Sequence, residues 1–127
     1  NGGVIYPELH AGRDALVGIA LMLTLLARRG GTMTALRATY PHYDMVKAKI
    51  DLDPTWDVDA LLDGFAARQA AHMPLTVDGV KLDLAEGWVH LRKSNTEPIM
   101  RVYAEATSSE AALNLVNTYK KDLLSGA

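Results

Sequence analysis

Two stretches of alternating apolar and polar residues, 88–92 and 99–106, constrain the fold of this chain more than any other feature. Successive side chains of a β-strand point to opposite faces of a sheet, so this alternation predicts two strands that each bury one face. A short polar connection, residues 92–98, joins them. The two stretches are therefore expected in one antiparallel sheet.

Three further stretches have strand character: residues 43–52, 75–77 and 80–84. Asp78-Gly79 separates the last two, and this dipeptide tolerates the positive φ angles of a two-residue turn. Residues 75–84 are therefore predicted to form a β-hairpin.

Two helices complete this part of the chain. The first is expected after Pro54 and Asp57 and the second after Ser108, because apolar residues then recur at helical spacing. The core stripe of the last helix is predicted to be Leu113, Val116, Tyr119 and Leu123. Residues 42–127 thus predict an α+β fold of order β-α-β-β-β-β-α, an antiparallel sheet with both helices on one face.

The first 41 residues have a different pattern. Residues 3–6 are predicted as a short strand without a partner strand in the sequence, and residues 12–29 as a helix. A second short helix, capped by Thr32 or Thr34, should end before Pro41. The long helix is apolar on nearly all faces, so it must be covered on more than one side. Residues 1–41 cannot bury that surface alone, and we expect protection from other domains or self-association.

Composition narrows the classes of function. The net charge is −2 and the 127 residues contain no Lys/Arg cluster, so nucleic acid is not an expected partner. The absence of cysteine excludes disulfides and thiolate metal sites and fits a cytoplasmic protein. The apolar run 15–27 is shorter than the roughly 20 residues that span a bilayer, so no membrane is expected. The four histidines show no metal-ligand spacing.

The connection Arg92-Lys93-Ser94-Asn95-Thr96-Glu97-Pro98 holds the residues best suited to ligand chemistry. An Arg side chain can bind two oxygens of a phosphate at once, and short polar residues allow backbone N–H groups to face an anion. The same residue types also make ordinary solvated turns. By composition alone, both interpretations remain open.

Residues 92–106 closely resemble the phosphate-binding loop and following strand in the last domain of the α-D-phosphohexomutases. Residues 1–5 and 7–15 resemble the end of that family's sugar-binding loop and the helix entry after it. The resemblance implies that residues 42–127 form the family's TATA-box-binding-protein-like last domain. It implies that residues 1–41 are the C-terminal tail of the third, sugar-binding α/β/α domain.

The resemblance also assigns site residues. It places the phosphate contacts on Arg92, Ser94, Asn95 and Thr96, and a sugar contact on Asn1. These groups would hold the non-reacting phosphate and orient the sugar, and the resemblance places no catalytic residue or metal ligand in this chain. Positioning of this kind contributes to catalysis without bond-making.

Neighbouring residues are expected to be structural. Glu97 should point away from a phosphate, toward Lys93 or Arg101, and Arg101 should form an ion pair. His10 and Asp14 are expected to support the helix start, Asp14 through the helix dipole. Gly3 stands where many family members carry His, which affects the sugar preference.

Family members move a phosphoryl group between the 1- and 6-positions of a hexose through a bisphosphorylated sugar. Their phosphoserine lies in the first domain and their Mg²⁺ loop in the second, so this chain alone is expected to be inactive. The sequence favours the phosphomannomutase/phosphoglucomutase type, with phosphoglucosamine mutase as the alternative. A non-catalytic phosphosugar-binding module is the alternative from another class. The expected partners are a hexose phosphate and the upstream domains.

Overall fold

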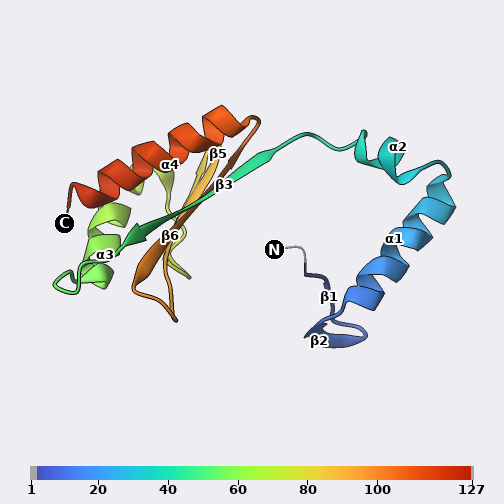
Figure 1. The fold of residues 1–127 in the computed structure, drawn as a ribbon, viewed down its shortest axis with the longest axis horizontal. Helices are drawn as coiled ribbons and strands as arrows, with labels where there is room; N and C mark the ends of the chain where they lie inside the picture. The colour runs from blue at the N-terminus through green and yellow to red at the C-terminus, as the bar shows by residue number, and fades with distance from the viewer. Residues whose placement is uncertain (1–2, 127) are drawn as a thin grey trace. The chain divides into compact units, whose positions relative to one another are not determined.

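The computed structural model describes residues 3–126, so Asn1, the expected sugar contact, lies outside the described residues. The chain forms two compact units, Asn1–Pro41 and His42–Ala127 (Figure 1). Each unit is described by itself below. In the part of the chain that the structure describes, no helix is long and apolar enough to cross a membrane.

The first unit begins with two short strands, β1 (Ile5–Tyr6) and β2 (His10–Arg13), which pair antiparallel. The expectation of a strand without a partner was therefore wrong, and the helix expected over residues 12–29 is present but begins later, at Ala15. The backbone turns at Leu9, whose N–H donates to the carbonyl of Tyr6 at 3.0 Å, and this turn brings β2 back beside β1. The partner strand was missed because its four residues are all exposed and show no apolar alternation.

Helix α1 (Ala15–Arg29) follows, with Asp14 as its N-cap. The Asp14 carboxylate accepts from the backbone N–H groups of Leu16 at 2.8 Å and Val17 at 3.0 Å. Asp14 therefore acts by direct capping rather than through the helix dipole alone. The short helix α2 (Met33–Arg37) is capped by Thr32, one of the two expected residues.

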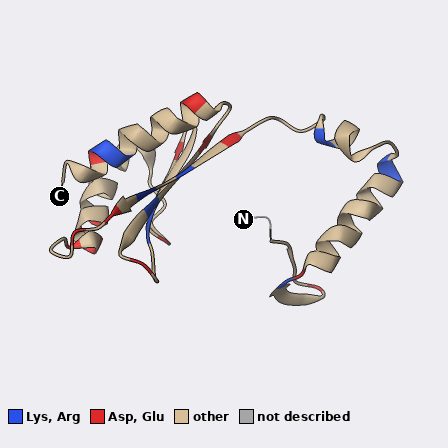
Figure 2. Cartoon of the chain, in the orientation of Figure 1, with Lys and Arg blue, Asp and Glu red and all other residues tan. Residues whose placement is uncertain are grey.

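Helix α1, which the structure describes in full, contains no buried residue. Its charged residues lie only at the C-terminal end, as Figure 2 shows. Leu16 is 78% exposed and Leu23 is 59% exposed. An apolar helix surface of this extent is unusual for a chain on its own, so the prediction that another domain or copy covers it stays in place.

The second unit contains a four-stranded antiparallel sheet of order β3-β6-β5-β4. Its strands are β3 (Asp44–Asp51), β4 (Val80–Leu84), β5 (Gly87–Lys93) and β6 (Ile99–Ala106). The long pairing of β3 with β6 places the first strand of the unit beside the last. The predicted strands 43–52, 88–92 and 99–106 are thereby confirmed within one or two residues.

The prediction of a fifth strand at residues 75–77 was wrong. Leu75 makes one isolated bridge with Lys81, and Val77 is 98% exposed. The hairpin partner of β4 is instead β5, joined through Glu86. Alternation over so few residues did not specify a strand, because the Val77 side chain finds no apolar surface to pack against.

Helices α3 (Val58–Arg68) and α4 (Ser109–Leu124) pack on one face of this sheet, as predicted. A short 3₁₀ turn, Ala70–His72, follows α3. Phe65 of α3 and Tyr119 of α4 meet edge to face, with ring centroids 6.2 Å apart. The predicted stripe of α4 needs one correction: Leu113 is 48% exposed, whereas Leu115 is buried with 5% exposed.

Candidate phosphate-binding loop

Residues 94–98 connect β5 to β6 at one end of the sheet. The connection is held closed by its backbone: the Ser94 N–H donates to the Ile99 carbonyl at 2.9 Å, and the Ile99 N–H donates to the Glu97 carbonyl at 2.8 Å. Asn95 and Thr96 lie at the exposed tip, and Ser94 is buried with 8% exposed. The tip therefore exposes polar side chains to solvent, while hydrogen bonds within the loop constrain its backbone.

Arg101 of β6 reaches back to this loop. Its Nη2 donates to Ser94 Oγ at 3.3 Å and lies 3.3 Å from Glu97 Oε2. Glu97 thus pairs with Arg101, and the ion pair expected for Arg101 is confirmed. One guanidinium thus fixes two residues of the loop.

Arg92 stands at the end of β5 and pairs with a residue outside the loop. Its Nη1 donates to Asp78 Oδ2 at 2.8 Å, and this hydrogen bond raises the pKa of Arg92. The Arg92 side chain is 40% exposed. A guanidinium has five N–H donors, so a single contact with Asp78 leaves further donors for a ligand.

Asp78 is held beside Arg92 by its backbone. The Asp78 carbonyl lies 2.6 Å from His90 Nε2, which acts as the hydrogen-bond donor to it. Gly79 has a φ of +72°, and a Cβ at this position would lie 2.2 Å from the Leu91 carbonyl oxygen. Only glycine fits so close to β5.

Arg92 and Arg101 are directly opposite one another in the pairing of β5 with β6, and Lys49 is opposite Arg101 in the pairing of β3 with β6. Alternation places these three residues on the sheet face that the helices do not cover. Like charges in directly opposite positions destabilise a sheet. The positive charges of this row are offset by carboxylates that lie beside them, Asp51 beside Lys49, Glu97 beside Arg101 and Asp78 beside Arg92.

Lys93 does not contribute to the row. Its Nζ lies 3.2 Å from both carboxylate oxygens of Asp59, in the first turn of α3. This ion pair ties the end of β5 to the helix layer.

The second candidate region lies in the first unit. His10 Nε2 is 3.0 Å from Asp14 Oδ2, while His10 Nδ1 accepts from the Gly12 N–H at 3.0 Å, and both contacts agree with the structural role expected for His10. The pKa of Asp14 is lowered, first by its hydrogen bond with His10. Gly3 lies against Arg13, whose Cδ would be 2.6 Å from a Cβ at position 3. A larger residue there would displace the Arg13 side chain.

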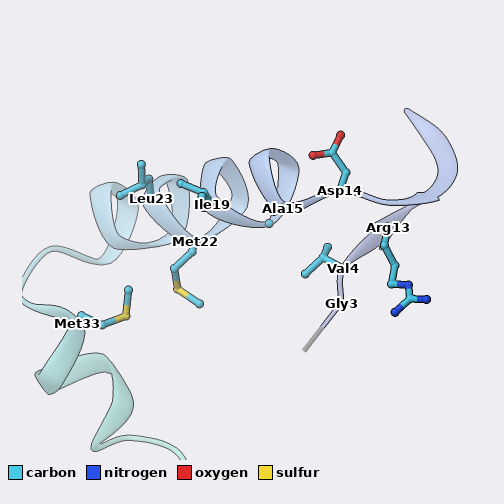
Figure 3. A pocket seen from close by; sticks show the side chains of 10 residues that line it. Gly3, Val4, Arg13, Asp14, Ala15, Ile19, Met22, Leu23 and Met33 are labelled. Carbon is cyan, nitrogen blue, oxygen red and sulfur yellow. The ribbon is translucent and has the colours of Figure 1, made fainter. Parts of the chain in front are cut away.

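An open hollow of about 540 Å³ lies beside α1, between residues 3–4 and Met33 of this unit (Figure 3). Its lining is mainly apolar, and the side chains of Val4, Met22 and Met33 surround it. This apolar character is unsuited to a sugar phosphate. The hollow belongs to the uncovered surface of α1 described above.

Two ion pairs of this region, Arg92 with Asp78 and Lys93 with Asp59, were missed from the sequence. Asp78 was interpreted only as a turn residue, and Asp59 was not considered. Val80 of β4 is opposite Leu91 of β5. Extending this register by one residue places Gly79 beside Arg92, so a correct prediction of the β4–β5 pairing would have shown that Asp78 lies near Arg92. In the part of the chain that the structure describes, no group of three or more His, Asp or Glu residues could hold a metal ion.

The sheet, its helix layer and the loop define an α+β domain with a polar loop at the end of two central strands. Residues 46–119 match the family model of the C-terminal domain of phosphoglucomutase/phosphomannomutase. This match covers more than half of the chain, so the chain belongs to the phosphoglucomutase/phosphomannomutase family.

Individual relatives agree. The chain is 39% identical over 125 residues to a phosphoglucosamine/phosphogalactosamine mutase of Sulfurisphaera tokodaii, which covers 95% of this chain and 27% of that protein. It is 35% identical over 114 residues to a phosphoglucomutase/phosphomannomutase of Thermococcus kodakarensis, which covers 88% of this chain and 25% of that protein. The chain thus spans about a quarter of the length of these curated relatives.

A solved structure has the same fold. The crystal structure of a phosphoglucomutase/phosphomannomutase family protein from Burkholderia thailandensis superposes with a TM-score of 0.70 and 24% identity. The comparison covers 98% of this chain and 27% of that one. At this identity the likeness supports the fold alone.

Proposed function

We propose that this chain is the substrate-phosphate-binding part of a phosphohexomutase. The complete protein would interconvert hexose 1-phosphate and hexose 6-phosphate through a bisphosphorylated sugar. Within it, residues 92–96 would bind the phosphate that is not being transferred. Family membership supports the class of reaction, and the loop geometry supports the division of labour.

The observation that carries the proposal is the arrangement of two guanidinium groups around the loop. Arg92 and Arg101 are opposite each other, and each is held by a carboxylate at 2.8 and 3.3 Å respectively. Arg92 retains free donors and partial exposure, whereas Arg101 is bound to Ser94 and Glu97. This arrangement combines one cation available for a phosphate with a second that shapes the loop.

The proposed contacts differ in kind. Arg92 would bind two phosphate oxygens through its free N–H groups. Asn95 and Thr96 would donate from the exposed tip, and the Ser94 hydroxyl would act from the buried base of the loop. Asn1 would add a sugar contact from the first unit, and its position lies outside the described residues.

Binding energy at this remote phosphate would orient the sugar, so that its other end faces the phosphoryl donor. A bisphosphorylated intermediate must present either end in turn, which a loop specific for phosphate rather than for sugar hydroxyls would allow. The loop residues themselves would make and break no bond. This chain by itself is therefore proposed to have no mutase activity.

The type of mutase is a second question. The sequence favoured the phosphoglucomutase/phosphomannomutase type. A specific observation favours the phosphoglucosamine type, because the Sulfurisphaera tokodaii relative named for that activity is 39% identical to this chain. Both types need the same phosphate loop, so the loop does not separate them.

Other parts of the proposal lie outside this chain. A Mg²⁺ ion and a phosphoserine would be supplied by upstream domains, and the described residues form no acidic cluster for the metal. Those domains would also cover the exposed apolar helix α1; a second copy of the chain is the alternative cover. The cytoplasmic location expected from the absence of cysteine is proposed along with the activity.

A coupled assay of the complete protein would test the proposal with glucose 1-phosphate, mannose 1-phosphate and glucosamine 1-phosphate. Turnover should occur with at least one of them and should fall by about 10- to 150-fold in kcat/KM in Arg92→Ala, the range expected for losing hydrogen bonds to a charged group. The preferred sugar identifies the type.

The control is Arg68→Ala, which removes a guanidinium that pairs with Asp122 in the helix layer, away from the loop. Its turnover should stay close to that of the unchanged protein. If no turnover occurs on any of the three sugars while phosphosugar binding is retained, the result would contradict the mutase and favour the alternative, a non-catalytic binding module. Full activity in Arg92→Ala would contradict the proposed phosphate contact of Arg92 and the role of the loop that depends on it.

A further inference from the structure

We infer that Asp78 is a positioning residue for Arg92, holding the guanidinium in the orientation that a phosphate requires. The inference rests on the proposed function, because it concerns the same loop. It adds a residue from a distant part of the chain that the loop motif does not contain. The contact joins residues 14 positions apart.

The first argument concerns the entropy of Arg92. A free arginine side chain samples many rotamers, and immobilising such a side chain on binding costs about 0.5–1.5 kcal/mol, which corresponds to roughly a two- to twelvefold loss of affinity. The hydrogen bond from Arg92 Nη1 to Asp78 Oδ2 at 2.8 Å restricts these rotamers before a ligand arrives. Asp78 would thereby reduce the cost of binding.

The second argument concerns Asp78 itself, since an anchor must be held in place. Its side chain is 63% exposed, yet its backbone is held against β5 on the C-terminal side. The His90 imidazole donates to its carbonyl at 2.6 Å, and Gly79 lies too close to the Leu91 carbonyl to admit any side chain. The backbone that carries the carboxylate is therefore anchored to β5, although Asp78 itself lies outside the strands.

The third argument concerns charge. A carboxylate near a phosphate is repulsive, but Asp78 contacts one of the five N–H donors and leaves the others available. Its exposure also allows solvent to screen the repulsion. We therefore expect the gain from orientation to exceed the repulsion, and the sign of the effect is what the experiment measures.

The chain offers a matched control in Asp83 of β4. Its side chain is also 63% exposed, and it pairs with one cation, Lys81. It lies opposite Trp88, toward the far end of β5 from the loop. Asp83→Ala thus removes the same charge and the same kind of ion pair without affecting Arg92.

The test uses all 127 residues of this chain, labelled with ¹⁵N and titrated with inorganic phosphate. The amide signals of residues 94–97 give a dissociation constant specific to the loop, and the Nε–H signal of Arg92 reports the order of the guanidinium. Asp78→Ala should raise the dissociation constant about two- to tenfold. Asp78→Asn should raise it less, because the amide oxygen still accepts a hydrogen bond. Asp83→Ala should change it by less than about twofold.

Two further measurements separate positioning from a general structural effect. The Arg92 Nε–H should become more mobile in Asp78→Ala, while the amide signals of core residues such as Val89 and Val102 stay in place. In an Arg92→Ala background, Asp78→Ala should have no additional effect, because its action passes through Arg92. Equal or tighter phosphate binding in Asp78→Ala would overturn the inference and would identify Asp78 as a competitor of the ligand.

Failure of the inference can be distinguished from failure of the proposed function. If the amide signals of residues 94–97 do not respond to phosphate, the loop is not the phosphate site and the proposed function fails. If they respond but Arg92→Ala leaves the dissociation constant unchanged, Arg92 is not a phosphate ligand and the inference about Asp78 fails with it. If Arg92→Ala weakens binding and Asp78→Ala does not, only the positioning role of Asp78 is lost.

Discussion

Arg92 and Arg101 occupy directly opposite positions on the two central strands, yet they have different tasks. Arg92 is held by Asp78 from the far side of β5, whereas Arg101 is held within the loop by Ser94 and Glu97. Two opposite arginines would repel each other in a sheet without such partners. The separate anchoring of the two guanidinium groups can be tested by changing each of them.

Arg101→Met should loosen the loop, because it removes the contacts with Ser94 Oγ and Glu97 while retaining apolar volume. Amide hydrogen exchange at Ser94 and Ile99, whose N–H groups close the loop, should become faster. Arg92→Met removes the opposite cation without touching these contacts, so exchange there should stay unchanged. Equal exchange in both variants would show that the backbone hydrogen bonds of the loop suffice to hold it.

Gly79→Ala should destabilise the second unit by about 2–4 kcal/mol, through a left-handed backbone and a direct clash with the Leu91 carbonyl. Gly64→Ala, within α3, is the matched control. Its Cβ would meet Arg68 Nη1 at an ordinary 3.5 Å, so the helix should gain up to about 1 kcal/mol. Urea unfolding of both variants measures the two free energies. Destabilisation by Gly64→Ala would contradict the open space described for that residue.

Leu115→Ala should lower the free energy of unfolding by about 2–5 kcal/mol, because the Leu115 side chain of α4 is buried in the core shared with the sheet. Leu113→Ala, two residues earlier in the same helix, should cost less than about 0.5 kcal/mol because Leu113 is 48% exposed. The two variants delete the same atoms, so the difference in urea midpoints isolates burial. Similar losses of stability in the two variants would mean that α4 is rotated about its axis, so that Leu113 is also buried.

The acid stability of the second unit should depend on Asp44. Its pKa is lowered, first by a hydrogen bond with Ser109 and further by His42. A carboxyl with a lower pKa in the folded state contributes stability above its unfolded pKa of about 3.9 and loses it as the pH falls through the folded value. Asp44→Asn should therefore reduce the slope of stability against pH below about pH 4.

Carbon-13 titration of the Asp44 carboxyl checks this assignment directly. Its midpoint should lie below the ordinary aspartate value in the folded chain. Ser109→Ala removes the first-named donor and should move the midpoint upward. A midpoint that is insensitive to Ser109 would assign the shift to His42 instead.

The outcome for β4 shows where sequence reasoning failed. Residues 75–77 and 80–84 were predicted as a hairpin around Asp78-Gly79, and the structure pairs β4 with β5 instead. Gly79 was correctly seen as a residue that needs positive φ, with an observed value of 72°. The reason predicted for this glycine was wrong. A glycine is required because residue 79 lies close to the Leu91 carbonyl, and not because it belongs to a two-residue turn.

Local sequence patterns determined much of the secondary structure of this protein. Alternation in β3, β5 and β6, helical spacing in α3 and α4, and the capping residues Asp57 and Ser108 follow from the chain itself, because each depends on neighbours within a few residues. The resemblance of residues 92–106 to the phosphohexomutase family also came from the sequence, and the family match confirms the family.

Only the tertiary structure decided which charges meet. Asp78 and Arg92 are 14 residues apart, and Asp59 and Lys93 are 34 apart, so neither contact is visible in a local pattern. The exposure of Leu113 and the strand order likewise depend on how the helices and strands pack. Sequence specifies a contact well when its partners are close along the chain. Where the partners are distant, strand register and packing bring them together.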